Sequence, residues 1–186
     1  MIAVFLCRAQ RNGVFMPDLG HTHHVLFVKL DGIGDYIFFR LFWPQIAAVA
    51  WQRNWKVSVL CSTSFLPVLE KYDSCYMDGF FTLPDVLKRK KSAFLCFLPR
   101  YYQRLRRGRK GQDIWKKNWA YVYNLQPGRE VIVENVMARV HSLHKISNKG
   151  INRLLAPTDF YQDDIYTRLV AVPMNKFVLS FFRELL

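Results

Sequence analysis

Three short apolar runs, each followed by a turn and then by a segment with helical features, constrain the fold most strongly. The runs are residues 25–30 (VLFVKL), 55–61 (WKVSVLC) and 119–124 (WAYVYN). Strands that are covered on both faces of a parallel sheet are typically continuous apolar runs of this length, rich in β-branched and aromatic residues. The sequence therefore predicts an α/β fold, a Rossmann-like parallel sheet with helices on both faces.

The segments between and after these runs predict the remaining elements. We expect a turn at 31–35, a helix over 36–54 that Pro44 kinks or breaks, and a short helix over 65–72. Further expectations are a weak strand at 76–82, a basic helical stretch at 86–107, a helix at 130–142, a short fifth strand at 145–147, a loop at 148–164 and an amphipathic helix at 175–186.

The chain divides into three parts. We expect a loose N-terminal extension at residues 1–24 and the Rossmann-like domain at 25–170. Residues 171–186 are expected to form a terminal helix or a linker to a further domain. The extension contains His21, His23 and His24, but no further ligand stands at a suitable spacing, so we expect no metal site. The four cysteines form no CxxC pair, which favours reduced thiols in a cytoplasmic protein.

Positive charge is concentrated in one segment. Residues 88–117 hold twelve Lys or Arg and one acid, so they carry +11 of the formal net charge of +13. Such a segment suits an anionic partner, either a membrane surface, a phosphorylated glycolipid or a nucleic acid; a solvated basic face without a partner is the alternative. The apolar run SAFLCFLP within it favours a membrane over a nucleic acid. The expected anion or membrane contacts are Arg104, Arg106, Arg107 and Arg109.

The turn DGIGD at 31–35 is the first candidate site, because ligands of open α/β sheets bind at the carboxyl ends of strands. Gly32 and Gly34 permit a tight turn and a close approach of a ligand. Asp35, at the start of a helix, is placed either to act as a general base or simply to interact with the helix dipole. A third glycine is missing, which disfavours an NAD-binding domain.

The second candidate site follows the run 119–124, in the segment NLQPGRE. If the sheet is parallel, this turn lies at the same edge as Asp35. Gln126 and Arg129 are then placed to hydrogen-bond a sugar or a phosphate, although ordinary turn chemistry explains the same residues.

Taken together, VLFVKLDGIGDY, WKVSVLCSTSFLPVLE, YVYNLQPGREVIVENVMARV and HKI resemble the N-terminal half of glycosyltransferase family 9, the ADP-heptose:lipopolysaccharide heptosyltransferases and their relatives. The resemblance covers roughly residues 24–150 in the family's order. It implies the N-terminal, acceptor-side domain of a GT-B fold, with Asp35 as the catalytic base and Gly34, Gln126 and Arg129 at the acceptor. Asn124 stands where the family usually has Asp.

The resemblance also implies an inverting transfer of a sugar from a nucleotide-sugar, with no metal or other cofactor, to a glycolipid or glycan acceptor at the inner face of the membrane. The donor would occupy a C-terminal domain, so we expect this chain to be incomplete and inactive alone, from a truncated or split reading frame. A separate chain would then supply that domain. The alternative is a non-catalytic basic module that binds acidic lipid or nucleic acid.

Overall fold

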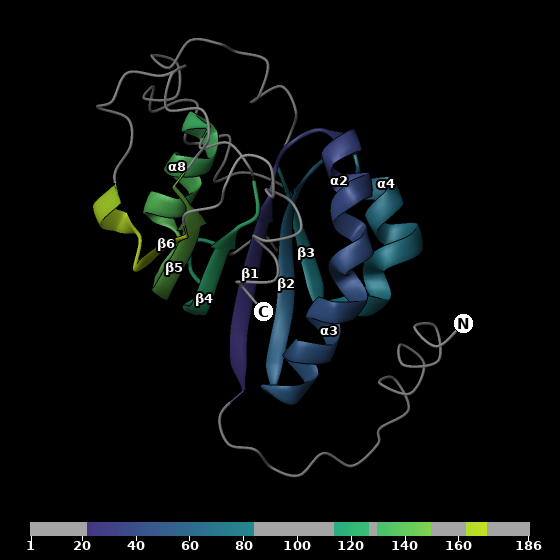
Figure 1. Ribbon diagram of the computed structural model, residues 1–186, viewed down its shortest axis with the longest axis horizontal. Helices are drawn as coiled ribbons and strands as arrows, with labels where there is room; N and C mark the ends of the chain where they lie inside the picture. The colour runs from purple at the N-terminus through teal and green to yellow at the C-terminus, as the bar shows by residue number, and fades with distance from the viewer. Residues whose placement is uncertain (1–21, 84–113, 127–129, 150–162, 171–186) are drawn as a thin grey trace.

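A computed structural model of the chain describes residues 22–83, 114–126, 130–149 and 163–170. The predicted basic helix at 86–107 and terminal helix at 175–186 lie outside these residues. The described part is built on one six-stranded sheet with the order β3-β2-β1-β4-β5-β6 (Figure 1). Its strands are β1 (His23–Lys29), β2 (Trp55–Ser62), β3 (Gly79–Leu83), β4 (Trp119–Asn124), β5 (Ser142–Asn148) and β6 (Arg168–Val170).

All five strand pairs are parallel, and β1 lies at the centre between β2 and β4. Alternate residues of β1 enter two separate cores. Val25 and Phe27 pack in one, whereas Leu26 and Val28 pack in the other. Both faces of β1 are therefore covered, as the uninterrupted apolar sequence from Val25 to Val28 predicted.

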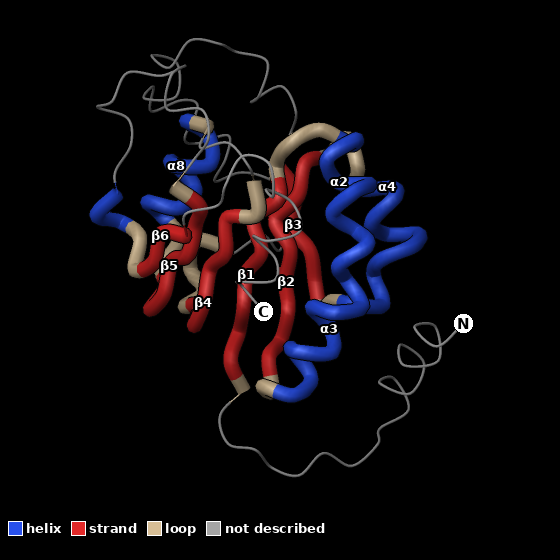
Figure 2. The backbone as a smooth tube through the Cα atoms, viewed as in Figure 1, coloured by secondary structure: helices blue, strands red, loops and turns tan. Residues whose placement is uncertain are grey.

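Helices cover both faces (Figure 2). One face carries α2 (Ile33–Phe39), the 3₁₀ turn η1 (Arg40–Phe42), α3 (Trp43–Gln52), α4 (Leu66–Val68), the π turn η2 (Leu69–Asp73) and the 3₁₀ turn η3 (Ser74–Tyr76). The other face carries α8 (Val131–Arg139). The predicted fold class, a Rossmann-like α/β sheet, is confirmed. Among the described residues, no helix has the length and apolar character needed to cross a bilayer.

Several boundaries differ from the prediction. The helix predicted over 36–54 begins three residues earlier, at Ile33, and is broken near Pro44, as predicted, into α2 and α3 with η1 between them. Pro44 lies in the first turn of α3, where a missing backbone N–H costs nothing, so it begins a helix here instead of kinking one. β1 begins at His23, two residues before the predicted strand, and β3 ends one residue later than predicted.

The last two strands were the least visible in the sequence. β5 spans Ser142–Asn148, longer than the predicted 145–147, because its polar first half pairs with β4 while staying largely exposed. β6 has only three residues and was not predicted; it follows a short 3₁₀ turn, η6 (Asp163–Ile165). Backbone pairing to a neighbour created both elements, and side-chain periodicity does not record that pairing.

A buried carboxylate of η2 fixes α2 and η1 to this neighbouring segment on the same face of the sheet. Asp73, which is 2% exposed, accepts the hydroxyl of Tyr36 at 2.8 Å and the guanidinium of Arg40 at 3.0 Å. Trp43 Nε1 donates to the same tyrosine oxygen at 3.3 Å. Burial, together with the bond to Asp73, raises the pKa of Tyr36, so the hydroxyl stays protonated as a donor. These bonds join three helical segments through one side chain.

We expect Asp73→Ala to lower the free energy of unfolding by about 3 kcal/mol, because the Tyr36 hydroxyl and the Arg40 guanidinium both lose a buried acceptor. Urea titration measures this change. Glu70→Ala, an exposed acid on the same turn, is the control and should change stability by less than about 0.5 kcal/mol. Equal effects of the two substitutions would contradict the assignment.

Candidate functional site at the carboxyl edge of the sheet

The sheet has a topological switch point between β1 and β4. After β1 the chain adds β2 and β3 on one side, and β4 then pairs with the other side of β1. Ligands of open α/β sheets bind at this place, beyond the carboxyl ends of the two strands. The two turns singled out by sequence lie side by side there. The backbone N–H of Leu125 donates to the carbonyl of Val28 near the end of β1 at 3.0 Å, and Lys29 contacts both Asp31 and Leu125. Their predicted position at a common edge is confirmed.

The first turn leads from β1 directly into α2. Gly32 is the N-cap and has an extended backbone (φ −71°, ψ 162°), so the turn does not need the left-handed conformation that glycine alone adopts freely. At Gly34, apart from the adjacent residues and the backbone of the helix itself, no heavy atom of the described residues lies within 4 Å of the point where a Cβ would stand. Because glycine has no side chain, a ligand can approach the backbone of the first turn of α2 closely at this position.

Asp35 lies in this first turn of α2, and its side chain is exposed. Its Oδ2 folds back over the turn, 3.6 Å from the position that a Cβ on Gly32 would take. This placement suits both roles that the sequence allowed. The carboxylate interacts favourably with the helix dipole, and it is accessible to a hydroxyl group that approaches the edge of the sheet.

A buried ion pair lies beneath Asp35. Lys29, which is 3% exposed, places its ammonium 2.5 Å from Asp31 Oδ2 and 3.4 Å from the carbonyl oxygen of Leu125. Burial raises the pKa of Asp31, the Lys29 charge opposes that rise, and the nearby charge of Asp35 adds to it. Lys29 therefore joins the end of β1, the first turn and the second turn at one point.

The second turn is held by buried amides. Asn124 accepts the backbone N–H of Gln126 through Oδ1 and donates through Nδ2 to Ser147 Oγ, both at 3.0 Å. Asn148 donates to the carbonyl of Gln126. An aspartate in place of Asn124 would accept both the N–H and the serine hydroxyl, so either residue type can hold this turn. Asn124, which stands where the resembled family usually has Asp, thus still makes hydrogen bonds to Gln126 and Ser147.

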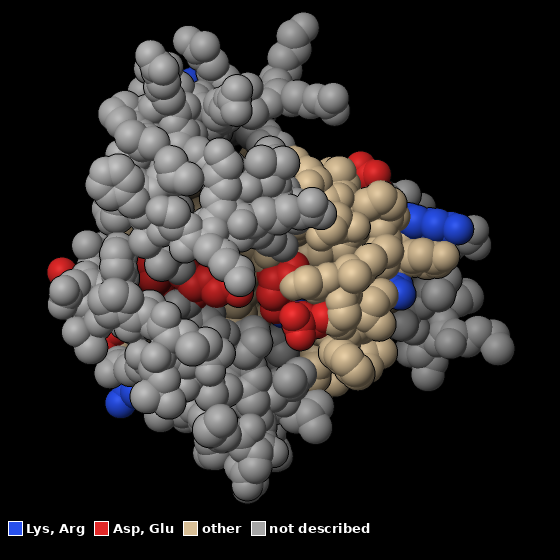
Figure 3. Space-filling model, turned by 90° about the horizontal axis from the view of Figure 1, so that it is seen from above, with Lys and Arg blue, Asp and Glu red and all other residues tan. Residues whose placement is uncertain are grey.

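Figure 3 views the molecule from the carboxyl edge and shows acidic side chains gathered in the middle of this face. Of the predicted site residues, Asp35, Gly34 and Gln126 lie at the common edge, with Gln126 only 1% exposed. The remaining predicted site residues lie outside the described part of the chain: Arg129, Arg104, Arg106, Arg107 and Arg109.

Sequence reasoning missed Lys29. The signal was available, because a lysine inside the apolar run VLFVKL must find a buried partner if the strand is covered on both faces. The partner itself could be found only once the turn geometry was known. Asp31 follows two residues later, and the carbonyl of Leu125 comes from a segment far along the chain.

A double-mutant cycle tests the buried pair. We expect Lys29→Met to reduce the free energy of unfolding by about 3 kcal/mol, because it leaves the Asp31 carboxylate buried without its cation. Adding Asp31→Asn should recover a large part of that loss. A double variant whose destabilisation equals the sum of the two single losses, measured by denaturant titration, would mean that the two side chains do not interact.

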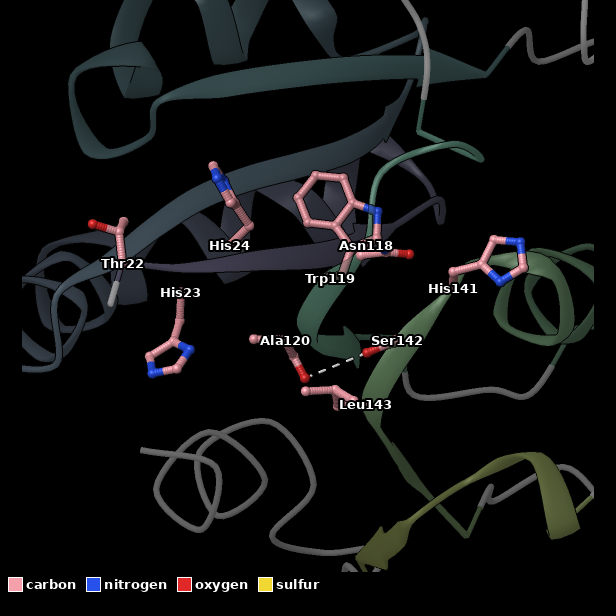
Figure 4. A pocket seen from close by; sticks show the side chains of 9 residues that line it. All are labelled: Thr22, His23, His24, Asn118, Trp119, Ala120, His141, Ser142 and Leu143. Atoms are coloured by element: carbon pink, nitrogen blue, oxygen red, sulfur yellow. Dashed lines mark hydrogen bonds between the residues drawn. The ribbon is translucent and has the colours of Figure 1, made fainter. Parts of the chain in front are cut away.

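A hollow of about 550 Å³ lies at the opposite, amino edge of the sheet (Figure 4). Its lining includes His23, His24, Trp119 and His141, from the beginnings of β1, β4 and β5. His23 and His24 are consecutive in a strand, so they point to opposite sides, and Figure 4 shows that the imidazoles do not converge. In the described part of the chain, no three His, Cys, Asp or Glu side chains are grouped as metal ligands.

His24 has a titration effect of its own. Its buried Nδ1 has no hydrogen-bond partner among the described residues. Burial, followed by the charges of Lys117 and Lys56, lowers the pKa of His24, whereas the charge of Asp78 acts in the opposite sense. Because the folded protein resists protonation of His24, the unfolded chain takes up its proton first as the pH falls below about 6.5. This histidine therefore makes the fold less stable in mild acid.

We expect the loss of unfolding free energy between pH 7 and pH 5 to be smaller in His24→Phe than in the parent chain, because the substitution removes a group that binds a proton more readily when unfolded. Urea titrations at both pH values measure the difference. His144→Phe, an exposed histidine of β5, serves as the comparison. An unchanged pH dependence in His24→Phe would contradict the expectation.

Comparison with solved structures identifies the fold. Escherichia coli heptosyltransferase WaaC with ADP matches with a TM-score of 0.58 at 17% identity, over 87% of this chain and 46% of that chain. Its complex with ADP-2-deoxy-2-fluoro heptose matches with 0.59 at 15% identity and the same coverage. A family 9 glycosyltransferase from Veillonella parvula matches with 0.55 at 13% identity, over 90% of this chain and 43% of that chain.

No protein-family model and no curated protein sequence matches the chain. The present chain spans less than half the length of each of these solved structures. The likeness therefore rests on the arrangement of the backbone; the match with the Veillonella structure covers 90% of this chain. The resemblance that the sequence motifs indicated is confirmed at the level of architecture: this chain has the Rossmann-like α/β fold found in structures of glycosyltransferase family 9.

Proposed function

We propose that this chain is the acceptor-side domain of a glycosyltransferase of the heptosyltransferase type. It would take part in the transfer of a sugar from a nucleotide-sugar to a lipopolysaccharide-type or other glycan acceptor. The observation that supports this proposal is the exposed carboxylate of Asp35 at the switch point of a fold shared with WaaC. The same edge presents an open glycine turn, which allows an acceptor to come close to the carboxylate.

In this mechanism Asp35 acts as the general base. Its carboxylate takes the proton of an acceptor hydroxyl while the acceptor oxygen forms a bond to the anomeric carbon of the sugar. The bond between that carbon and the diphosphate breaks on the opposite face, so the configuration inverts and the nucleoside diphosphate leaves with the electron pair. No redox step or metal is required by this balance.

The neighbouring residues hold the base in position. The Lys29 ammonium neutralises the buried Asp31 carboxylate directly below the turn, which limits the repulsion that Asp35 experiences from a second acid. The Asp73 network fixes the helix on which Asp35 stands. These bonds come from buried groups, so the base is supported from within the fold and remains accessible from outside.

The donor would be held by a second Rossmann-like domain, in the same or a separate polypeptide. ADP and an ADP-sugar are bound in the WaaC structures named above, and a nucleotide-sugar is the corresponding co-substrate proposed here. We further propose a cytoplasmic protein at the inner face of the membrane, with the basic segment 88–117, including Arg104, Arg106, Arg107 and Arg109, in contact with anionic lipid.

The central test is Asp35→Asn, in this chain joined to a donor-binding domain. We expect kcat for sugar transfer to fall by roughly 10²–10⁴-fold, because the amide cannot accept the hydroxyl proton. Transfer of radiolabelled sugar from a nucleotide-sugar to a lipid-linked glycan measures the effect. Asp164→Asn changes an exposed acid in the turn before β6, at the other edge, and should leave kcat unchanged.

Full activity of the Asp35→Asn enzyme would contradict the assignment of Asp35 as the general base. The alternative, a non-catalytic basic module, makes two different predictions. The joined protein would transfer no sugar, and binding to acidic lipid or nucleic acid would be lost on neutralising the four arginines Arg104, Arg106, Arg107 and Arg109.

A further inference from the structure

We propose that the outer side of α2 and η1 is a membrane-docking surface that inserts apolar side chains between lipid headgroups beside the candidate site. We call it the α2 face and define it by Ile33, Ile37, Phe38 and Leu41. These side chains are 47%, 44%, 67% and 72% exposed, respectively. Four large apolar side chains exposed within nine residues form a contiguous patch of the kind that marks an interaction site.

The spacing places them together. Ile33, Ile37 and Leu41 stand four residues apart, so they form one row along the helix, with Phe38 beside it. The opposite side of the same helix is buried, with Tyr36 and Phe39 in the core. The helix is therefore apolar on both its inner and its outer side, although packing within the domain requires only the inner side.

The border of the α2 face carries cations and an aromatic ring. Tyr72 is 52% exposed, and the Arg40 guanidinium and the Lys71 ammonium lie 5.0 and 5.1 Å from the centre of its ring. Arg40 is already paired with the buried Asp73, so the exposed Lys71 and Tyr72 are the groups at this border that can face lipid. Apolar side chains flanked by a tyrosine and a basic group are typical of surfaces that rest on lipid, with the ring and the cation at the level of the headgroups.

Charge and area together favour a lipid surface as the occupant. The chain carries a formal net charge of +13, of which +11 belongs to residues 88–117, so an anionic membrane attracts the chain as a whole. Figure 3 shows that the described surface on the side of α2 and α4 is largely uncharged, with Lys or Arg and an acidic side chain at its rim. A row of four side chains is small for a second copy of the chain, since a stable dimer buries roughly 800 Å² on each partner.

The location connects this surface with the site. The α2 face begins at Ile33, two residues before Asp35 and on the same helix, at the carboxyl edge. Docking through this face would bring that edge to the headgroup level, where a lipid-linked glycan presents its hydroxyl groups. This relation to a lipid-linked acceptor rests on the proposed function, but docking itself requires no sugar transfer and is measured separately.

The test is the double variant Phe38→Ser with Leu41→Ser, assayed by sedimentation with vesicles of phosphatidylglycerol and phosphatidylcholine. We expect the partition coefficient to fall at least roughly tenfold, because two inserted side chains lose their apolar contact. Leu143→Ser is the matched control; Leu143 is 75% exposed but lies on β5 at the other edge, so binding should stay unchanged. Both substituted positions are exposed, and circular dichroism checks that the double variant folds.

Unchanged vesicle binding in the double variant would overturn the proposal and leave the basic segment as the sole membrane contact. A concentration-dependent dimer that the double variant abolishes, without a change in vesicle binding, would assign the α2 face to a second copy instead. Asp35→Asn should bind vesicles like the parent chain. Failure of sugar transfer therefore leaves this proposal intact, and failure of docking leaves the proposed catalytic base intact.

Discussion

The candidate site depends on one buried ammonium group. Lys29 stands at the end of the central strand, between the turn that leads to Asp35 and the turn that follows β4. A lysine is costly to bury, so its presence within the core requires an anion and an acceptor close by. Asp31 and the carbonyl of Leu125 satisfy this requirement, and both belong to the turns that form the edge. The contacts that compensate the buried charge thereby hold the two loops in fixed positions relative to each other.

A second set of buried polar contacts fixes the helix that carries the candidate base. Asp73 binds Tyr36, which directly follows Asp35 in α2, and Arg40, which is the first residue of η1. The Asp35 turn is thus restrained from the strand side by an ion pair and from the helix side by a carboxylate network. Asp35 itself stays exposed between these two anchors. A rigid support beneath an accessible carboxylate is the arrangement that proton transfer to a positioned base requires.

The two edges of the sheet differ in what they offer. The carboxyl edge combines buried polar anchors, an open glycine turn and an exposed acid. The amino edge has a hollow of about 550 Å³ with several histidines, but their side chains diverge, and the buried Nδ1 of His24 has no hydrogen-bond partner among the described residues. The chemistry of the residues and the topology of the strands point to the other one.

The sequence by itself determined the fold class, the central strands and the meeting of two turns at one edge, because continuous apolar runs and glycine-containing turns are local features. It also indicated the break near Pro44. It did not reveal β6 or the first half of β5, which exist through backbone pairing with a neighbouring strand.

Only the tertiary structure decided which groups answer the buried Lys29, that Asn124 can hold its turn in place of an aspartate, and that the outer side of α2 stays uncovered. These facts depend on contacts between segments far apart in the chain or on the burial of a whole surface. No pattern within a short window of sequence contains that information.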